Sequence, residues 1–327
     1  MDDGHNRLPV ACPVSSCCSR SGETGIGPSL SRRQFLSGLA ASSAVISVFG
    51  VDALAAQHTN SPCKIIGFTK PFQTASPAEI ADIVAEVGWD GVECPVRPKG
   101  QIEPERVEEQ LPRLVEALRK VGREVTLIST SIKKVSPLTE KVLRTASNLG
   151  IRRYRMAFWN YSADKPIPDQ VAEIRAAMRD LAAINKELDL CGAHQNHSGA
   201  AYFGAPIWDI YESIKDYDPN HLGICFDIGH ATIEGGLSWP IEAQLMRPFY
   251  TAVFVKDFVW KKSEKGWNVE WCPLGEGAVD PKFFGMLKQS GYNRPISQHH
   301  EYEVGTGAAM IAAMKKDLDV LKQWLAT

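Results

Sequence analysis

The sequence lacks a net charge of any size, and it lacks the clusters of positive charge that nucleic-acid binding needs. Its 36 lysines and arginines are balanced by 38 aspartates and glutamates, which gives a formal net charge of -2 over 327 residues. Non-specific binding to nucleic acid draws its free energy from clustered Lys and Arg against phosphates. We therefore expect no nucleic-acid partner.

Close cysteine pairs are also missing from most of the chain. After residue 56 the cysteines are Cys63, Cys94, Cys191, Cys225 and Cys272. An odd number without a close pair fits neither a disulfide framework nor a zinc-ribbon spacing. Three of them, Cys94, Cys191 and Cys225, sit within apolar runs, so we predict that these thiols are buried and inert.

The first 56 residues differ from the rest of the chain. Arg32 and Arg33 precede an uncharged, mostly apolar stretch over residues 37–51, and small residues follow at 53–56. This order is typical of a twin-arginine export signal. The apolar core is about 15 residues long, whereas a membrane span needs roughly 20, so a retained anchor is the weaker alternative. We predict a signal peptide over residues 1–56 and a mature protein, residues 57–327, that is periplasmic or extracellular and has no stable membrane anchor.

After Pro62 the sequence alternates between short β-rich runs and amphipathic helical stretches. The eight strand-like runs are residues 64–69, 91–95, 124–130, 153–158, 190–195, 222–227, 252–257 and 295–301. The helix-like segments are residues 76–87, 104–121, 138–149, 169–188, 208–215, 239–247, 281–290 and 308–327. This pattern predicts an α/β fold, a single-domain (β/α)8 TIM barrel. A doubly wound open sheet is the runner-up, but it usually has a glycine-rich phosphate loop after its first strand, and residues 67–71 lack one.

A barrel of this kind carries its active site at the C-terminal ends of its strands. Five histidines fall at or just past the predicted strand ends: His194, His197, His230, His299 and His300. Alternation along the fifth strand places Gln195 and His197 on one face and His194 on the other.

Charged residues also end the last three predicted strands. They are Asp227 on the sixth strand, Lys256 on the seventh and Glu301 on the eighth. Any one of them could be a strand-end salt bridge or a helix cap. Several charges gathered in one place predict a functional site, because burying them together costs free energy that a structural role seldom offsets.

At these residues the sequence resembles a known family. Residues 227–230, residues 255–257, and residues 275–280 leading through 290–292 to Glu301 look like the xylose-isomerase-like barrels, which include sugar isomerases, epimerases and endonucleases. The resemblance covers the chain from Lys64 to its end and is most specific in the second half. It implies a divalent metal (Mn, Mg or Zn), held by a glutamate, an aspartate, a histidine and a glutamate on strands five to eight.

Under this resemblance Asp227 and Glu301 are expected as metal ligands or acid–base groups, and His230 as a contact to substrate hydroxyls. Two positions depart from the family pattern. Phe254 stands where the metal-binding histidine is expected, and Gln195 stands where the first glutamate is expected. An amide can offer an oxygen ligand but cannot act as a base at neutral pH.

The missing nitrogen ligand has two candidate replacements, and metal binding has an alternative. His299 shares a face with Glu301, and His197 lies near the same mouth, so either could replace the missing histidine. We expect Asp227, Glu301, Gln195 and His299 as the metal set. Alternatively no metal binds, and Lys256 is the cation for developing oxyanions.

The predicted mouth also offers side chains suited to a carbohydrate. Substrate contacts are expected from His230, His197, Arg155, Glu93 and Trp271, with Arg97, Trp159, Trp260 and Trp267 nearby. The four tryptophans were expected in loops. Aromatic faces in a polar cleft suit the apolar faces of sugar rings.

The leading functional hypothesis is a sugar isomerase- or epimerase-like enzyme in which Glu301, Asp227, Lys256 and His230 are catalytic and the ligand is a small carbohydrate. A lyase or hydrolase of an oxidised (keto) glycoside is the second hypothesis, because one base suffices there and export favours it. A non-catalytic periplasmic sugar-binding barrel is the third, favoured by Phe254. An endonuclease is disfavoured by the charge balance. A homo-oligomer stays open.

Overall fold

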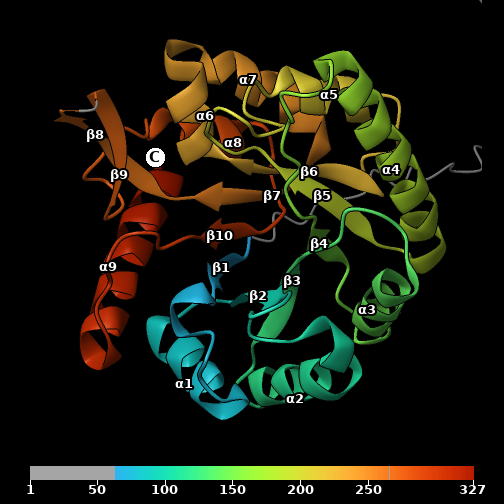
Figure 1. The fold of residues 1–327 in the computed structure, drawn as a ribbon. Coiled ribbons are helices and arrows are strands. Elements are labelled where there is room, and N and C mark those ends of the chain that lie inside the picture. The colour runs from blue at the N-terminus through green and yellow to red at the C-terminus, as the bar shows by residue number, and fades with distance from the viewer. Residues whose placement is uncertain (1–62, 265) are drawn as a thin grey trace, which may run out of the picture. The chain divides into compact units, whose positions relative to one another are not determined.

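The fold is described by a computed structural model that covers residues 63–264 and 266–327. The predicted signal peptide, residues 1–56, lies outside these described residues. Eight parallel strands close into a barrel in the order β1-β10-β7-β6-β5-β4-β3-β2, and helices surround it (Figure 1). The prediction of a single-domain TIM barrel is confirmed.

The barrel strands lie close to the predicted ranges, and so do the helices except α6, which was not predicted. The strands are β1 (Ile65–Phe68), β2 (Gly91–Val96), β3 (Glu124–Thr130), β4 (Arg153–Arg155), β5 (Cys191–Gln195), β6 (Leu222–Asp227), β7 (Tyr250–Val255) and β10 (Ile296–Gln298). The α-helices are α1 (Pro77–Val87), α2 (Val107–Lys120), α3 (Pro137–Asn148), α4 (Ile167–Leu188), α5 (Trp208–Ile214), α6 (Ile228–Gly235), α7 (Trp239–Met246), α8 (Lys282–Gln289) and α9 (Gly307–Ala326). Strands β4 and β10 are shorter than predicted, because the residues after them leave the ladder and form the mouth.

Local sequence explains where the first helix begins and ends. Ser76 accepts a hydrogen bond from the backbone N–H of Glu79, and the Glu79 carboxylate accepts one from the Ser76 N–H. This reciprocal pair is a capping box, and Pro77 at the first helical position adds a fixed φ. The helix ends at Gly88, which adopts a left-handed φ of 93°. The residues that begin and end this helix could thus be identified from the sequence.

A small apolar layer fills the barrel interior below the mouth. It consists of Ile66, Leu127, Ala193, Cys225, Ala252 and Phe254. The short side chains of Ala193 and Ala252 leave room for the Phe254 ring. Burial raises the pKa of the Cys225 thiol well above its ordinary value, as expected for an inert packing residue. The prediction that Cys94, Cys191 and Cys225 are buried is confirmed.

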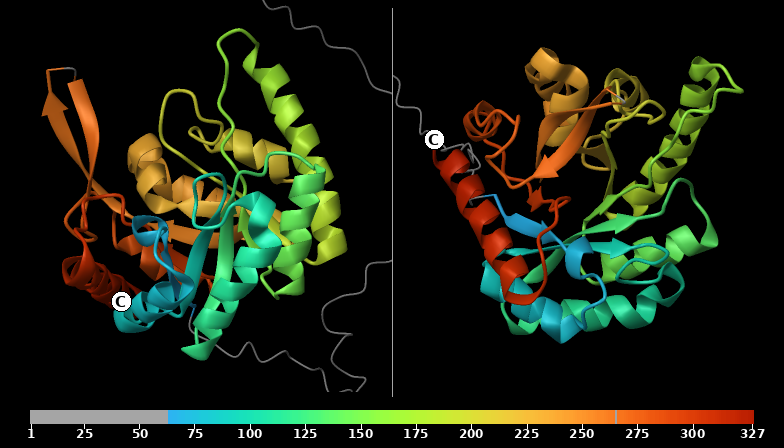
Figure 2. Two further views of the ribbon diagram at one scale, coloured as in Figure 1. Left: turned by 60° about the horizontal axis from the view of Figure 1, so that its bottom comes forward. Right: turned by 60° about the vertical axis from the view of Figure 1, so that its left-hand side comes forward.

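A hairpin after β7 was not predicted. Strands β8 (Asp257–Ser263) and β9 (Gly266–Cys272) pair antiparallel and stand out from the barrel (Figure 2). We expected loops here because the segment mixes tryptophans with charged residues. Apolar and polar residues alternate from Trp267 to Trp271, a pattern typical of a strand, and the loop prediction did not use it. Within residues 63–264 and 266–327, no helix is long and apolar enough to cross a membrane.

Candidate active site

A cavity of about 210 Å³ opens at the C-terminal ends of the strands. It is lined by Phe68, Lys70, Arg97, Arg155, Phe158, Gln195, His197, His230, Lys256, Trp271, His299 and Glu301. Eight of the predicted site residues are among them: Arg155, Gln195, His197, His230, Lys256, Trp271, His299 and Glu301. The strand-end rule therefore selected residues that the fold brings together around one cavity.

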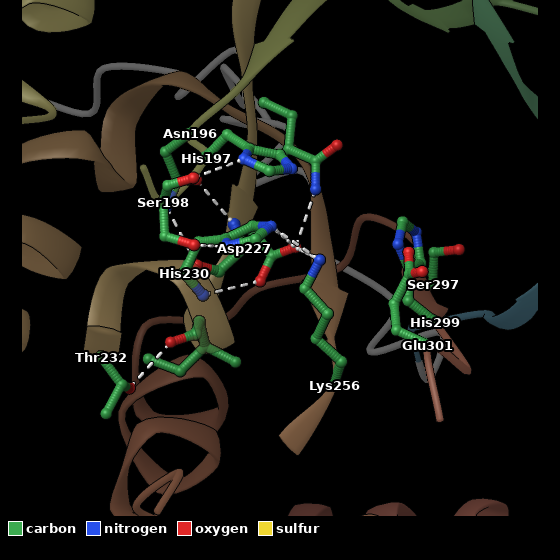
Figure 3. A network of polar contacts seen from close by, with 12 residues as sticks. Asn196, His197, Ser198, Asp227, His230, Thr232, Lys256, Ser297, His299 and Glu301 are labelled. Atoms are coloured by element: carbon green, nitrogen blue, oxygen red, sulfur yellow. Dashed lines mark hydrogen bonds and ion pairs between the residues drawn. The ribbon is translucent and has the colours of Figure 1, made fainter. Parts of the chain in front are cut away.

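Lys256, directly after β7, is one of two buried cations that line this cavity, and Arg155 is the other. Its Nζ lies 3.0 Å from Asp227 Oδ2 and donates to His230 Nε2 at 2.8 Å (Figure 3). The same nitrogen lies 4.7 Å from the centroid of the Trp271 ring. An ion pair held away from water is screened far less than a surface pair. The cavity wall thus carries a fixed positive charge at Lys256, besides those of Lys70, Arg97 and Arg155.

Asp227 is fully buried and does not line the cavity. Its Oδ1 accepts the backbone N–H of His230 at 3.0 Å, which makes it the N-cap of α6. Its Oδ2 accepts the Gln195 amide N–H at 2.8 Å as well as the ammonium of Lys256. Both structural readings of this residue, helix cap and salt bridge, therefore apply. Asp227 holds Lys256 in position rather than reaching a ligand itself.

His230 is a neutral link between Lys256 and Ser198. Burial, and then the charge of Lys256, lower the pKa of His230 well below its ordinary value. Because the ammonium donates to Nε2, the ring proton is assigned to Nδ1, which donates to Ser198 Oγ at 2.8 Å. His197 lies against His230 with ring centroids 4.0 Å apart. These two imidazoles therefore offer hydrogen bonds without adding positive charge.

Glu301 is the carboxylate that faces the cavity; the structure places no other Asp or Glu among its lining residues. Lys70 donates to its Oε2 at 2.7 Å. Burial alone would raise the pKa of Glu301, but Lys256, Lys70 and His299 together lower it. The group is therefore ionised at neutral pH and able to accept a proton.

Glu93 lies beneath the cavity and does not line it. It accepts hydrogen bonds from His299 Nε2 at 2.8 Å, from Ser297 Oγ at 2.7 Å and from Ser129 Oγ. Burial would raise its pKa, but His299, Arg155 and Ser129 lower it overall. The predicted substrate contact from Glu93 is replaced by a positioning role, because the side chain orients His299.

Arg155 reaches the cavity from β4. Its Nη1 donates to Gln195 Oε1 at 3.2 Å, and its guanidinium lies over the Phe158 ring at 4.7 Å. Gln195 in turn donates to Asp227, so its amide group forms a hydrogen-bonded bridge between the Arg155 cation and the Asp227 anion. A carboxylate at position 195 would instead face Asp227.

The predicted metal set does not converge in this arrangement. Among residues 63–264 and 266–327, no group of three or more His, Cys, Asp or Glu side chains is placed to hold a metal ion. The oxygens of Asp227 are taken by Lys256, Gln195 and the α6 backbone, Glu301 pairs with Lys70, and His299 donates to Glu93. Phe254 offers no donor. The residues Asp227, Glu301, Gln195 and His299, as placed, do not fit a divalent ion.

Two of the five predicted mouth histidines point elsewhere. His194 packs outside the barrel and lies 3.1 Å from the carbonyl oxygen of Phe203. His300 lies outside as well, beside Trp89 with ring centroids 5.9 Å apart. Side chains alternate along a strand, so the neighbours of the inward-facing Gln195 and His299 must face outward.

Several tryptophans also differ from their prediction. Trp260, Trp267 and Trp271 belong to strands β8 and β9 rather than to loops. Trp159 packs on Phe203 at 6.1 Å and does not line the cavity. Sequence reasoning missed Lys70, although its place directly after the first strand was the same signal that located the other groups.

The comparisons with known proteins agree with this fold. The sequence pattern of the xylose isomerase-like TIM barrel family matches residues 81–324. The chain belongs to this family. No curated protein matches the chain in sequence.

Solved structures of the xylose isomerase-like fold resemble the described barrel. A 3-keto-D-glucoside 4-epimerase from E. coli is 14% identical with a TM-score of 0.63, covering 80% of this chain and 100% of its own. A D-allulose 3-epimerase from Methylomonas sp. is 16% identical with a TM-score of 0.62, covering 80% and 98%. A xylose isomerase-like TIM barrel protein from Mycobacterium smegmatis, in complex with magnesium, is 15% identical with a TM-score of 0.59, covering 81% and 99%. At these identities the likeness concerns the fold.

Proposed function

We propose that the protein is a sugar isomerase- or epimerase-like enzyme that moves a proton at the carbon beside a carbonyl of a carbohydrate. The observation that carries this proposal is the pairing of one ionised carboxylate, Glu301, with one buried cation, Lys256, on the wall of the same cavity. Proton abstraction beside a carbonyl needs a base and a positive group for the oxygen that becomes negative.

In this mechanism the C–H bond beside the carbonyl breaks and its proton passes to the Glu301 carboxylate. The electron pair forms the carbon–carbon double bond of an enolate, and the carbonyl oxygen becomes negative. Lys256 stabilises that oxygen, while Arg155 and His197, whose pKa burial lowers, bind the remaining hydroxyls. Glu301 then returns the proton to the former carbonyl carbon. The hydroxyl on the neighbouring carbon gives its proton to the enolate oxygen and becomes the new carbonyl, which completes an isomerisation.

A lyase acting on a keto glycoside is the second candidate, and the identity of residue 195 favours it. Epimerisation with two bases needs a second carboxylate across the ring, and Gln195 cannot serve. In an elimination, Glu301 takes the proton beside the carbonyl, the glycosidic C–O bond breaks, and the departing oxygen takes the proton from Glu301. One acid–base group is enough for both halves of that reaction.

Hydrogen exchange and bond cleavage separate these candidates. The mature protein is incubated in D₂O with ketohexoses and with methyl 3-keto-glucopyranoside, and products are followed by proton NMR. Deuterium at the carbon beside the carbonyl supports isomerisation or epimerisation, and released methanol supports the lyase. Lys256→Met should abolish either signal. A ligand that binds but neither exchanges nor breaks would favour the sugar-binding barrel and contradict both enzymatic proposals.

The cation and the location are further parts of this proposal. We propose that Lys256 takes the electrostatic role that the family resemblance assigned to a divalent metal. We also propose export by the twin-arginine route. Replacing Arg32 and Arg33 together by lysine should leave the uncleaved precursor inside the cell, as followed by immunoblotting of cell fractions. Normal export of that variant would contradict the signal-peptide prediction.

A further inference from the structure

The two strands of the β8–β9 hairpin place most of their aromatic side chains on one face. The register pairs Phe258 with Trp271, Trp260 with Val269, and Lys262 with Trp267. Residues that oppose each other in an antiparallel pair project to the same side, and alternate residues share a face. Phe258, Trp260, Val269, Trp267 and Trp271 therefore share one side, which we call the aromatic face.

The aromatic face runs from the catalytic cavity into solvent. At its base Phe258 is buried, and Trp271 lines the cavity beside Lys256. The rings of Phe258 and Trp260 contact edge to face, with centroids 5.6 Å apart. Further out, Trp260 is 46% exposed and Trp267 is 65% exposed. Exposed apolar surface of this kind beside a cavity indicates a binding surface, so we expect a ligand to cover the two indole rings.

The base of the hairpin is fixed by a single carboxylate. Asp257 Oδ2 accepts the backbone N–H groups of Gly275 and Gly277, both at 3.0 Å, and its Oδ1 accepts that of Val279 at 3.0 Å. These bonds join the start of β8 to the chain that follows β9. The base of the hairpin is thus tied to the chain that follows it, and the hairpin stands out from the barrel (Figure 2).

We propose that the aromatic face is an outer subsite for the part of a glycoside beyond the reacting sugar. This inference rests on the proposed function, since it extends the same cavity. The cavity of about 210 Å³ is smaller than the ~300–1,000 Å³ of a typical ligand pocket, so it takes a single sugar ring. A second sugar ring or an aromatic aglycone then lies outside, where Trp260 and Trp267 can stack on its apolar face.

Titration calorimetry with two ligands tests this subsite. The probes are methyl 3-keto-glucopyranoside and 3-keto-cellobiose, measured on mature protein carrying Glu301→Gln to prevent turnover. We expect the disaccharide to bind about tenfold more tightly, equivalent to about 1.4 kcal/mol. Adding Trp260→Ala and Trp267→Ala should remove that preference and leave the affinity for the methyl glycoside unchanged. The matched control is Trp208→Ala, a 53% exposed tryptophan on α5, which should change neither affinity.

The outcomes distinguish the subsite from the function on which it rests. Equal affinities for both ligands before the tryptophans are replaced, or equal losses for both afterwards, would overturn the subsite and leave the proposed function standing. Failure of both ligands to bind would overturn the proposed function itself. Sedimentation velocity adds a further check, because a dimer that the double tryptophan variant dissociates without changing either affinity would make this face a contact between copies and overturn the proposal.

Discussion

The two ends of the barrel carry similar charged residues in very different surroundings. At the N-terminal end, Lys64 and Glu124 form an ion pair whose side chains are 52% and 44% exposed. At the mouth, Lys256 and Asp227 are 4% and 0% exposed. The cavity at the N-terminal end is the larger, about 530 Å³ against about 210 Å³. Volume alone would therefore favour the N-terminal end as a site, whereas burial of charge favours the mouth, because a pair exposed to water is weak and a buried one interacts strongly.

The largest effect should come from removing the carboxylate that faces the cavity. Glu301→Gln cannot accept a proton, so the rate of exchange or cleavage should fall by about 10²–10⁴-fold. Glu124→Gln at the opposite end is the matched control and should keep the parent rate. Steady-state kinetics on the active substrate measure both. A Glu301→Gln protein that turns over at the parent rate would place the chemistry elsewhere.

Stability should separate the two ends in the same way. Asp227→Asn leaves the Lys256 ammonium buried without its counter-charge, and we expect a loss of about 3–5 kcal/mol in the free energy of unfolding. Glu124→Gln breaks an exposed pair and should cost about 0–1 kcal/mol. Urea unfolding followed by circular dichroism gives both values. Similar losses at the two ends would remove the distinction drawn between them.

A smaller effect concerns the outward face of β5. Burial lowers the pKa of His194 to about 3, and its contact with the Phe203 carbonyl offsets only part of that shift. Between its ordinary pKa and this value the unfolded chain binds a proton that the native protein does not. This histidine therefore removes about 1.4 kcal/mol of stability for each pH unit as the pH falls below ~6.5.

His194→Gln should lack this contribution. Its free energy of unfolding should fall less steeply than that of the parent over the same pH range, as measured by urea unfolding at several pH values. Other buried histidines, such as His230 and His300, are present in both proteins and cancel in the comparison. Parallel curves for the two proteins would mean that His194 is not protonated on unfolding.

The smallest effect should follow removal of metal. Because we propose that Lys256 takes the electrostatic role of a metal, dialysis against a chelator should leave activity unchanged, and elemental analysis should find less than one divalent ion per chain. Stoichiometric metal that is needed for activity would show that Lys256 moves away from Asp227 in the working enzyme. It would also restore the metal set predicted from the family resemblance.

The fold could be predicted from the sequence because each barrel strand is a short apolar run and each helix has its own start and stop residues. Strand ends then located Lys256, His230 and Glu301 at the mouth. Alternation also separated Gln195 from His194 correctly. Applied to the last strand as well, the alternation rule would have predicted that His300, like His194, faces out of the barrel.

The partners within the site could not be predicted in this way. Lys70 and Glu301 meet across the first and last barrel strands, 231 residues apart in sequence, and only the closed barrel joins them. Asp227 and Lys256 were both predicted to be catalytic, because each is a charged residue at the end of a predicted strand. Which of them reaches the cavity depends on the packing of α6 and on the hydrogen bonds of Gln195.

The anchor at Asp257 makes the hairpin an exchangeable module. Its bonds to the backbone of residues 275–279 tie the chain before the hairpin to the chain after it, so the geometry at the base does not depend on what lies between. Residues 259–270 can therefore be replaced by a shorter turn or a longer hairpin while β7 and α8 keep their places. For protein engineering this is a graft site: the range of ligands that reach the mouth can be altered in a single segment that leaves Lys256 and Glu301 untouched.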